Sequence, residues 1–395
     1  MKQLRIPAVY MRGGTSKGVF FLAGDLPADP ALRERVLLRV IGSPDPYGKH
    51  IDGMGGATSS TSKVVIVGRS TRPDCDVDYL FGQVAVDRPV IDWSGNCGNL
   101  TAAVGPFAIA SGLLPAAADG LMRVRIWQAN VGRKIAAEVP VQGGEVQETG
   151  QFELDGVAFP AAEVRLEFLD PAAEDGSTGG ALFPTGARLD KLDVPGLGQF
   201  EATLINAGNP AIFIAAEALG LSGTELPAEV NGNAALLARA EAIRCAGALA
   251  MGLVHNAEQA AQRMHTPKLA VLAPPAAYTS SSGKRIEARD MDFLARIFSM
   301  GQLHHAMTGT GAVALAVAAA IPGTLVSRYT GPAGRGEVRF GHPSGLLQAG
   351  AVAEQIDGNW VVRKAVMSRS ARRIMEGWVR IPPLPGWDGP ANRDK

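Results

Sequence analysis

The chain repeats one plan of motifs in its two halves, and this duplication constrains the fold more than any other feature. In the first half, AVYMRGGTSKGVFFLAGDLP (Ala8 to Pro27) has the pattern of two strands joined by a glycine turn, and ATLINAGNPAIFIAAEALG (Ala202 to Gly220) repeats it. Further along, GNCGNLTAAVGPFAIASGLLP (Gly95 to Pro115) is echoed by AMTGTGAVALAVAAAIPG (Ala306 to Gly323). Each of these is a glycine turn that opens an apolar segment. Two related domains are the simplest explanation.

Each half combines strand patterns with one segment that is apolar on all sides. KVVIV (Lys63 to Val67) and VRIWQANVG (Val124 to Gly132) predict strands, whereas the segments Leu100 to Leu114 and Ala312 to Ile321 predict helices. A helix that is apolar all round must be buried. We therefore expect an α+β fold of two pseudo-symmetric domains, each a sheet wrapped round a central buried helix, with a cleft between them.

A stretch rich in glycine, proline and acidic residues, DPAAEDGSTGGALFPTG (Asp170 to Gly186), marks the expected domain boundary. We predict an N-terminal domain over residues 1–184 and a C-terminal domain over residues 185–370. The C-terminal tail, residues 371–395, is a candidate for completing the N-terminal domain.

Composition and charge exclude several classes of protein. The 395 residues carry 38 basic and 38 acidic side chains, so no net field attracts nucleic acid and no nucleic-acid partner is predicted. The three cysteines form no CxxC pair, which indicates neither a disulfide framework nor a thiolate zinc site. The six histidines lack metal-ligand spacing, so no metal is predicted. The N-terminus lacks a signal-peptide pattern and no apolar run approaches the ~20 residues that span a bilayer, so we expect a cytoplasmic protein without membrane contact.

Cys97 lies in GNCGN, at the predicted start of the first buried helix, where unpaired backbone N–H groups favour an anion. The alternative is a small buried thiol without a function. The flanking glycines allow a ligand to approach the backbone, and Asn96 and Asn99 offer donors and acceptors, so we favour a functional cysteine. Thr308 opens the second buried helix in the same way, either as an ordinary N-cap or as part of a site for a small polycarboxylate on which both helix starts converge.

Lys63 ends a loop rich in glycine, serine and threonine and immediately precedes a strand that looks buried, which is unusual for a lysine. We interpret it as a candidate base, while the loop hydroxyls either orient a carboxylate or only cap the loop. The turn MRGGTSKG lacks the GxxxxGK[ST] spacing and a following helix, and GTGAVA at Gly309 lacks a βαβ context, so no nucleotide is predicted. HTPK (His265 to Lys268) and RFGHPSG (Arg339 to Gly345) are further candidate loops.

Long ordered motifs give the chain a family resemblance. It resembles the 2-methylaconitate isomerase (PrpF) family over essentially its whole length, in MRGGTSKGVFF, RVIGSPDPYGKHIDGMGGATSSTSK, DYLFGQV, DWSGNCGNLTAAVG, INAGNP, SMGQLHHAMTGT, RFGHPSG, MSRSAR and MEGWVR. The resemblance implies a diaminopimelate epimerase-like fold, no cofactor and no metal. It also implies that Lys63 and Cys97 transfer protons. Epimerase relatives have a second cysteine where this chain has Thr308, which argues against a two-thiol mechanism.

The resemblance implies a small tricarboxylate substrate, 2-methylaconitate or trans-aconitate, isomerised in the methylcitrate cycle of propionate catabolism. Alternatives are a 4-oxalomesaconate tautomerase or related 1,3-allylic isomerase and, more distantly, a non-catalytic polycarboxylate-binding protein. A homodimer is a reasonable expectation.

The chemistry of such a substrate indicates how the residues would act. Loss of a proton beside a conjugated carboxylate gives a dienolate, whose charge helix N-termini and cationic side chains stabilise. We expect neutral Lys63 to remove the proton and Cys97 to act as acid or partner, although the two roles are interchangeable on sequence grounds. The residues expected to bind the substrate are Arg12, Gly14, Thr15, Ser16, Ser59, Ser60, Asn96, Gly98, Asn99, Asn206, Asn209, Lys268, Ser299, Met300, His305, Met307, Thr308 and Gly309.

Overall fold

The first half of the chain builds a sheet around one helix. A computed structural model describes residues 3–172, 181–331 and 334–390, so part of the expected boundary, residues 173–180, lies outside the described residues. The elements of this half are β1 (Leu4–Gly13), β2 (Ser16–Leu22), α1 (Pro30–Ile41), β3 (Lys63–Arg69), β4 (Val77–Val84), β5 (Ile91–Asp92), α2 (Gly98–Ala110), β6 (Gly120–Gln128), β7 (Arg133–Gln142), β8 (Glu145–Val146) and β9 (Glu163–Leu169).

The second half follows the same plan with additional outer helices. Its elements are β10 (Asp190–Val194), β11 (Gly198–Ala207), β12 (Asn209–Ala215), α3 (Pro227–Asn231), α4 (Ala234–Ala250), α5 (Ala257–Gln262), β13 (Lys268–Ala273), β14 (Tyr278–Thr279), β15 (Arg285–Ile286), β16 (Phe293–Ser299), β17 (Gln302–Leu303), α6 (Gly309–Ala320), α7 (Ser327–Thr330), β18 (Glu337–His342), β19 (Gly345–Ile356) and β20 (Asn359–Ile381).

Strand pairing repeats between the halves in both order and direction. β1–β2 is antiparallel, β2–β3 parallel, β3–β4 antiparallel, β4–β6 parallel and β6–β7 antiparallel. The pairs β11–β12, β12–β13, β13–β16, β16–β18 and β18–β19 have the same directions in the same order. The motifs that recur in the sequence therefore fold into recurring structure, and the protein is a mixed α/β protein rich in strands.

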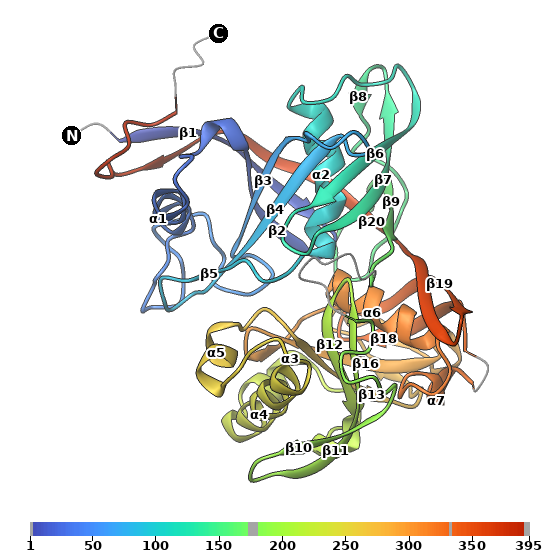
Figure 1. The fold of residues 1–395 in the computed structure, drawn as a ribbon. Coiled ribbons are helices and arrows are strands. Elements are labelled where there is room, and N and C mark those ends of the chain that lie inside the picture. Colours follow the sequence, from blue (N-terminus) through green and yellow to red (C-terminus); the bar gives the residue numbers. More distant parts are fainter. Residues whose placement is uncertain (1–2, 173–180, 332–333, 391–395) are drawn as a thin grey trace.

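The long strand β20 belongs to both halves. It pairs with β19 of the second half, its residues 364–370 pair with β9, and its residues 371–381 pair with β1. In Figure 1 it runs from the lower half of the molecule into the upper one. The end of the chain thus completes the sheet at its beginning, and the two halves share one continuous hydrogen-bonded ladder.

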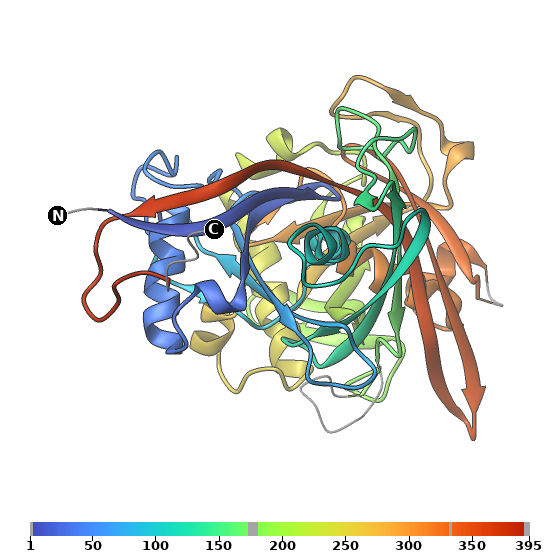
Figure 2. The ribbon, with the colours of Figure 1, turned by 90° about the horizontal axis from the view of Figure 1, so that it is seen from above.

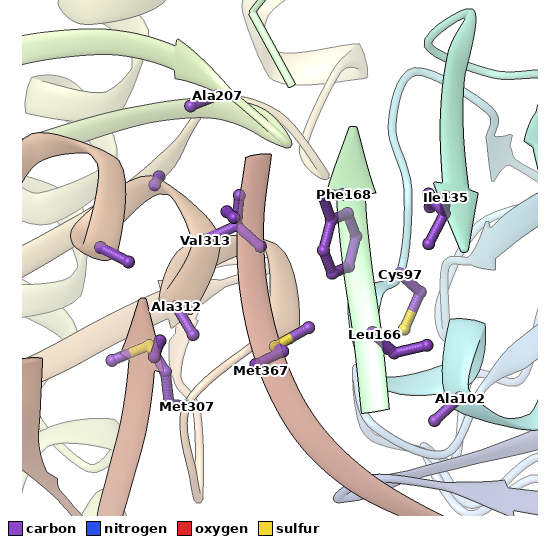
Figure 3. Packing of buried hydrophobic residues seen from close by; sticks show 14 of the residues in the cluster. Cys97, Ala102, Ile135, Leu166, Phe168, Ala207, Met307, Ala312, Val313 and Met367 are labelled. Atoms are coloured by element: carbon purple, nitrogen blue, oxygen red, sulfur yellow. The ribbon is translucent and has the colours of Figure 1, made fainter. Parts of the chain in front are cut away.

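The two apolar segments form the predicted buried helices. α2 and α6 begin two and three residues earlier than the apolar runs, because their first turns consist of glycine, asparagine and threonine. Figure 2 looks along α2 and shows strands wrapped around it. One apolar cluster contains residues of both helices, and Figure 3 shows Met367 of β20 and Phe168 of β9 between them.

Each sheet is covered on both faces, which explains why its strands are almost continuously apolar. Along β3, Val65 and Val67 belong to the cluster around α2, whereas Val64 and Ile66 belong to the cluster beneath α1. In the second half, α4 covers the outer face in the same manner. The alternation is the period of two expected of a strand, and it fixes which side chains point to the central helix.

Candidate functional site

The first residues of α2 and α6 lie directly against each other. A Cβ placed on Gly98 would be 2.8 Å from the backbone of Gly309 and Thr310, and one placed on Gly309 would be 2.5 Å from the carbonyl carbon of Gly98. The two helices therefore begin at one place, which only glycine allows. The positive ends of both helix dipoles converge there, and such an end favours a bound anion.

Lys63 and Cys97 meet beside this junction. The Lys63 Nζ donates to the Cys97 Sγ over 3.5 Å, and the two residues are only 5% and 6% exposed. Cys97 is the N-cap of α2, and its sulfur accepts from the backbone N–H of Leu100, also over 3.5 Å. The Lys63 Nζ also lies 5.2 Å from the centroid of the Phe81 ring.

Strand geometry places this lysine toward the helix. Lys63 is the first residue of β3 and has the same parity as Val65 and Val67, which face α2. It therefore points inward, where a charged side chain is costly unless it has a function or a partner. A buried amine in contact with a thiol can pass one proton across that contact, so the pair can both accept and return a proton.

A second buried lysine lies on the other half. Lys268, 2% exposed, donates from its Nζ to the Ser299 Oγ over 2.8 Å and to the His265 Nδ1 over 3.2 Å. A carbonyl can only accept, so the opposite ring nitrogen of His265, 3.2 Å from the carbonyl of Asn96, carries a proton. The Nδ1 then has a free lone pair that accepts from Lys268, as in a neutral imidazole. Burial, followed by the charge of Lys63, lowers the pKa of Lys268 to about 7. Burial also holds the pKa of His265 well below its usual range.

The loop before Cys97 is held by residues of the second half. Asn209 accepts from the backbone N–H of Asn96 over 2.8 Å and donates to its carbonyl over 2.9 Å. Asp92 accepts from the backbone N–H of His265 over 2.8 Å. Gly95 has no space for a side chain, because a Cβ there would be 2.7 Å from Thr266. The position of the thiol thus depends on both halves of the chain.

The turn between β1 and β2 reaches the same junction. The Asn99 Nδ2 donates to the Thr15 Oγ1 over 3.1 Å and to the Met307 carbonyl over 3.5 Å. Gly14 has φ +51° and lies against the Asn99 side chain. His305 adjoins this turn, and burial followed by the charge of Lys63 lowers its pKa. The expected residues from both halves are therefore brought together here.

Several expected residues have contacts elsewhere. Met11 faces α2, so Arg12 points to the opposite face of the strand, where it donates to the carbonyls of Gly14 and Ser370 over 3.1 and 2.9 Å. Met300 lies in the turn after β16, in a small hollow beside α4.

For three more expected residues the structure shows local contacts or partial burial. The Ser60 hydroxyl bonds to that of Thr58, Ser59 is half-buried, and the backbone N–H of Asn206 donates to the carbonyl of Leu182. Thr308, by contrast, lies at the junction as the N-cap of α6, where its hydroxyl accepts from the backbone N–H of Gly311 over 3.1 Å.

Several buried polar atoms have no hydrogen-bond partner among the described residues. Those that can donate from residues around the junction include the Ser16 Oγ, the Asn96 Nδ2 and the Arg369 Nη2. Such atoms are rare in folded proteins and indicate groups that a bound polar molecule would satisfy. Burial lowers the pKa of Arg369 to about 10, and its Nε donates to the Asn99 Oδ1 over 3.0 Å.

Sequence reasoning left out Arg369 and gave His265 only a place in a candidate loop. An arginine on a strand is normally a surface residue, so nothing local marks Arg369. A signal for His265 was available in the duplication. Lys268 occupies in the second half the place of Lys63 in the first, and His265 stands only three residues before it. In the part of the chain that the structure describes, no three histidine, cysteine or acidic side chains gather to hold a metal, and no helix is long and apolar enough to cross a membrane.

Comparison with solved structures defines the class of fold. A hydroxyproline epimerase from Agrobacterium vitis has a TM-score of 0.55 at 12% identity, over 97% of this chain and 94% of that one. The protein thus has a fold of the proline racemase and epimerase type. A crystal structure of methylitaconate-delta-isomerase, 39% identical, has a TM-score of 0.76 over 99% of this chain and 100% of that one.

The chain belongs to the PrpF protein family, whose model matches residues 3–382 and confirms the resemblance seen in the motifs. It is 61% identical to 2-methyl-aconitate isomerases from Cupriavidus necator and Shewanella oneidensis. In both cases the match covers 96% of this chain and 98% of the relative.

Proposed function

We propose that this protein is a cofactor-independent isomerase of aconitate-type tricarboxylates, and that 2-methylaconitate is the favoured substrate. The observation that carries the proposal is the buried contact of 3.5 Å between the Lys63 amine and the Cys97 thiol at the start of α2. The similarity of the whole chain to 2-methyl-aconitate isomerases supports the choice of substrate. The reaction belongs to the methylcitrate cycle of propionate catabolism.

The reaction begins with loss of a proton from the carbon beside a carboxylate that is conjugated through the double bond. Lys63 or Cys97 takes this proton, and the electron pair of the broken C–H bond spreads into a dienolate. Convergent helix starts stabilise the negative charge as it develops. Return of a proton to the same carbon after rotation gives cis-trans isomerisation, whereas its return to the other end of the allyl system gives a 1,3 double-bond shift.

Polar groups around the junction support binding of several carboxylates. The unpartnered atoms of Ser16, Asn96 and Arg369 are available as donors. Because Lys63 and Cys97 are nearly inaccessible to solvent, substrate entry requires the surrounding segments to separate and then close again. The further binding groups that we infer at this junction are Thr15, Asn99, Asn209, Lys268, His305 and Thr308.

We also infer that the chain consists of two diaminopimelate epimerase-like domains, residues 1–184 and 185–370, with the tail from residue 371 completing the first. The repeated strand pairing and the pairing of β20 with β1 support this division. The two domains share part of β20, because residues 364–370, which we assign to the second domain, pair with β9 of the first.

Proton NMR of 2-methylaconitate and trans-aconitate with the purified enzyme in D2O, without added metal or nucleotide, tests the proposal. We expect the isomer to appear with deuterium at the allylic carbon that is reprotonated. If the enzyme converts 4-oxalomesaconate but neither of these two compounds, the proposed substrate is wrong and the protein is the tautomerase of the alternative. Saturable binding with neither conversion nor deuterium exchange would overturn catalysis and favour a binding protein.

A further inference from the structure

Lys268 occupies in the second half the position that Lys63 occupies in the first. In the parallel pair β2–β3, Val19 lies beside Val64, the residue after Lys63. In the parallel pair β12–β13, Ile212 lies beside Leu269, the residue after Lys268. Each lysine is the first residue of its strand and is buried at the junction of the halves. The repeated fold therefore places one amine on each side of the paired helix starts.

The surroundings of Lys268 do not explain it as a structural cation. Its hydrogen-bond partners, Ser299 and His265, are both neutral, and among the described residues it forms no ion pair. The titratable groups around it are Lys63, Cys97, Asp92 and Arg244, together with the two histidines His265 and His304. Of these, only Asp92 is a carboxylate, and it accepts from the backbone N–H groups of Ser94 and His265. A buried amine without a carboxylate partner is costly to a fold.

We propose that Lys268 is a second proton-transfer residue of the site, acting on the side of the substrate opposite Lys63 and Cys97. The inference rests on the proposed isomerase function. It gives the site two acid–base groups on different halves of the chain, although Thr308 replaces the second thiol.

The two groups divide one reaction. The Lys63–Cys97 pair takes the proton from the allylic carbon, and the electrons of that C–H bond enter the dienolate. The Lys268 ammonium then gives its proton to the carbon that forms the new C–H bond and becomes a neutral amine. Release of the abstracted proton to water and uptake of another by Lys268 restore the starting state, so that no oxidant or co-reactant is needed.

The protonation of Lys268 suits this role. A group whose pKa lies close to the working pH is present in both forms and can both give and accept a proton. The pKa of Lys268 is lowered to about 7, mainly by burial and then by Lys63. An amine with the ordinary lysine value would hold its proton too firmly at neutral pH to return it quickly.

The decisive experiment follows deuterium exchange and isomer formation together, with trans-aconitate in D2O. For Lys268→Met we expect product formation to fall by about 10²-fold or more, the usual contribution of an acid–base group, while exchange into the remaining substrate continues. For Lys63→Met both should be lost. Isomerisation by Lys268→Met within about tenfold of the parent rate would overturn the proposal, as would an equal loss of both processes. Failure of the parent protein to exchange or isomerise would instead contradict the proposed function itself.

A measurement on the unaltered protein removes dependence on how the variants fold. Substrate carrying deuterium at the allylic carbon is converted in H2O, and the product is analysed at its new C–H bond. With two separate groups, the abstracted deuteron does not reach the new bond. Deuterium found there in a single turnover would show that one group both removes and returns the proton, and would overturn a role for Lys268 in proton transfer.

Discussion

Gly98 and Gly309, the first residues of the two buried helices, are in backbone contact, so that each occupies the space a side chain of the other would need. This contact lets both helix starts face one substrate. It also joins the two halves at the point where the thiol of Cys97 and the hydroxyl of Thr308 cap their helices. The approach of the helix starts is therefore a condition for the site, and it can be tested directly.

Gly309→Ala should lower kcat while leaving the fold intact. A Cβ at this position meets backbone at 2.5 Å, so the helix starts must move apart. The backbone of Gly309 does not have a positive φ, so alanine fits the helical conformation itself and a loss of activity would reflect the displaced backbone. We expect at least a tenfold lower kcat, measured with far-UV circular dichroism unchanged. Gly232→Ala is the matched control, because a Cβ there makes only an ordinary contact at 3.8 Å. Full activity of Gly309→Ala would show that the contact is not needed.

Cys97→Ser should retain the fold and lose turnover. Serine is among the preferred N-cap residues, so the start of α2 remains capped. The hydroxyl is a much weaker acid than the thiol, and we expect kcat to fall by about 10²- to 10⁴-fold. Cys245→Ser is the control, because this cysteine lies on the outer helix α4 beside Glu241 and has no part in the proposed site. Equal activity of the two variants would reduce Cys97 to a helix cap.

Asn209→Ala should weaken both stability and activity, because Asn209 holds the loop that carries the thiol. Its loss leaves the buried backbone N–H and carbonyl of Asn96 without this partner. Each unpaired group should lower the free energy of unfolding by about 1–3 kcal/mol. Thr310→Val is the milder comparison, since it removes only the acceptor of one Asn209 bond of 3.2 Å. Urea unfolding and kcat should rank parent, Thr310→Val and Asn209→Ala in that order. A stable, fully active Asn209→Ala would contradict the loop-holding role.

Local sequence patterns predict the parts of this protein that depend on local geometry. The glycine turn at Gly14, the strand that begins at Lys63 and the helix behind Cys97 follow from periodicity and from the repeated motifs. Alternation along β1 also indicates that Arg12 points away from α2 once Met11 is taken as a core residue. The duplication also contains the equivalence of Lys268 with Lys63. The sequences before the two lysines differ, however, since His265 stands where the first half has Ser60, and local similarity therefore does not indicate the match.

Other features depend on pairing between distant segments and leave no local signal. β20 is an ordinary polar strand in the sequence, yet it joins the sheets of both halves and carries Arg369 to the Asn99 side chain. The backbone contact of Gly98 with Gly309 depends equally on how the halves meet. Such relationships follow from tertiary packing, which outweighs local preference.

Lys268→Met should make the protein more stable below pH 7 and remove part of its pH dependence. The folded protein holds the pKa of Lys268 near 7, whereas the unfolded chain has the ordinary value near 10.5. Between these values the unfolded state binds more protons, so the parent's free energy of unfolding rises as the pH rises through this window. Below pH 7 the parent bears the full cost of burying the ammonium. Methionine has no such cost, and since one pKa unit corresponds to ~1.4 kcal/mol, the variant should be more stable by at least that amount at pH 6.

The difference in free energy of unfolding between parent and variant should shrink as the pH approaches 10. There the amine is neutral in the folded protein, and in the unfolded chain it binds a proton only weakly. Urea unfolding of both proteins from pH 6 to 10 measures the difference, and Ser299→Ala is the control, because it removes a partner of the amine but leaves the amine in place. A difference that is constant across this range would mean that Lys268 binds its proton equally in the folded and unfolded protein, and therefore stays an ammonium at neutral pH. The same amine would then be unable to give and accept protons at neutral pH. A stability gain below pH 7 that accompanies loss of isomerisation would show that the fold accepts the cost of a buried lysine because the reaction requires it.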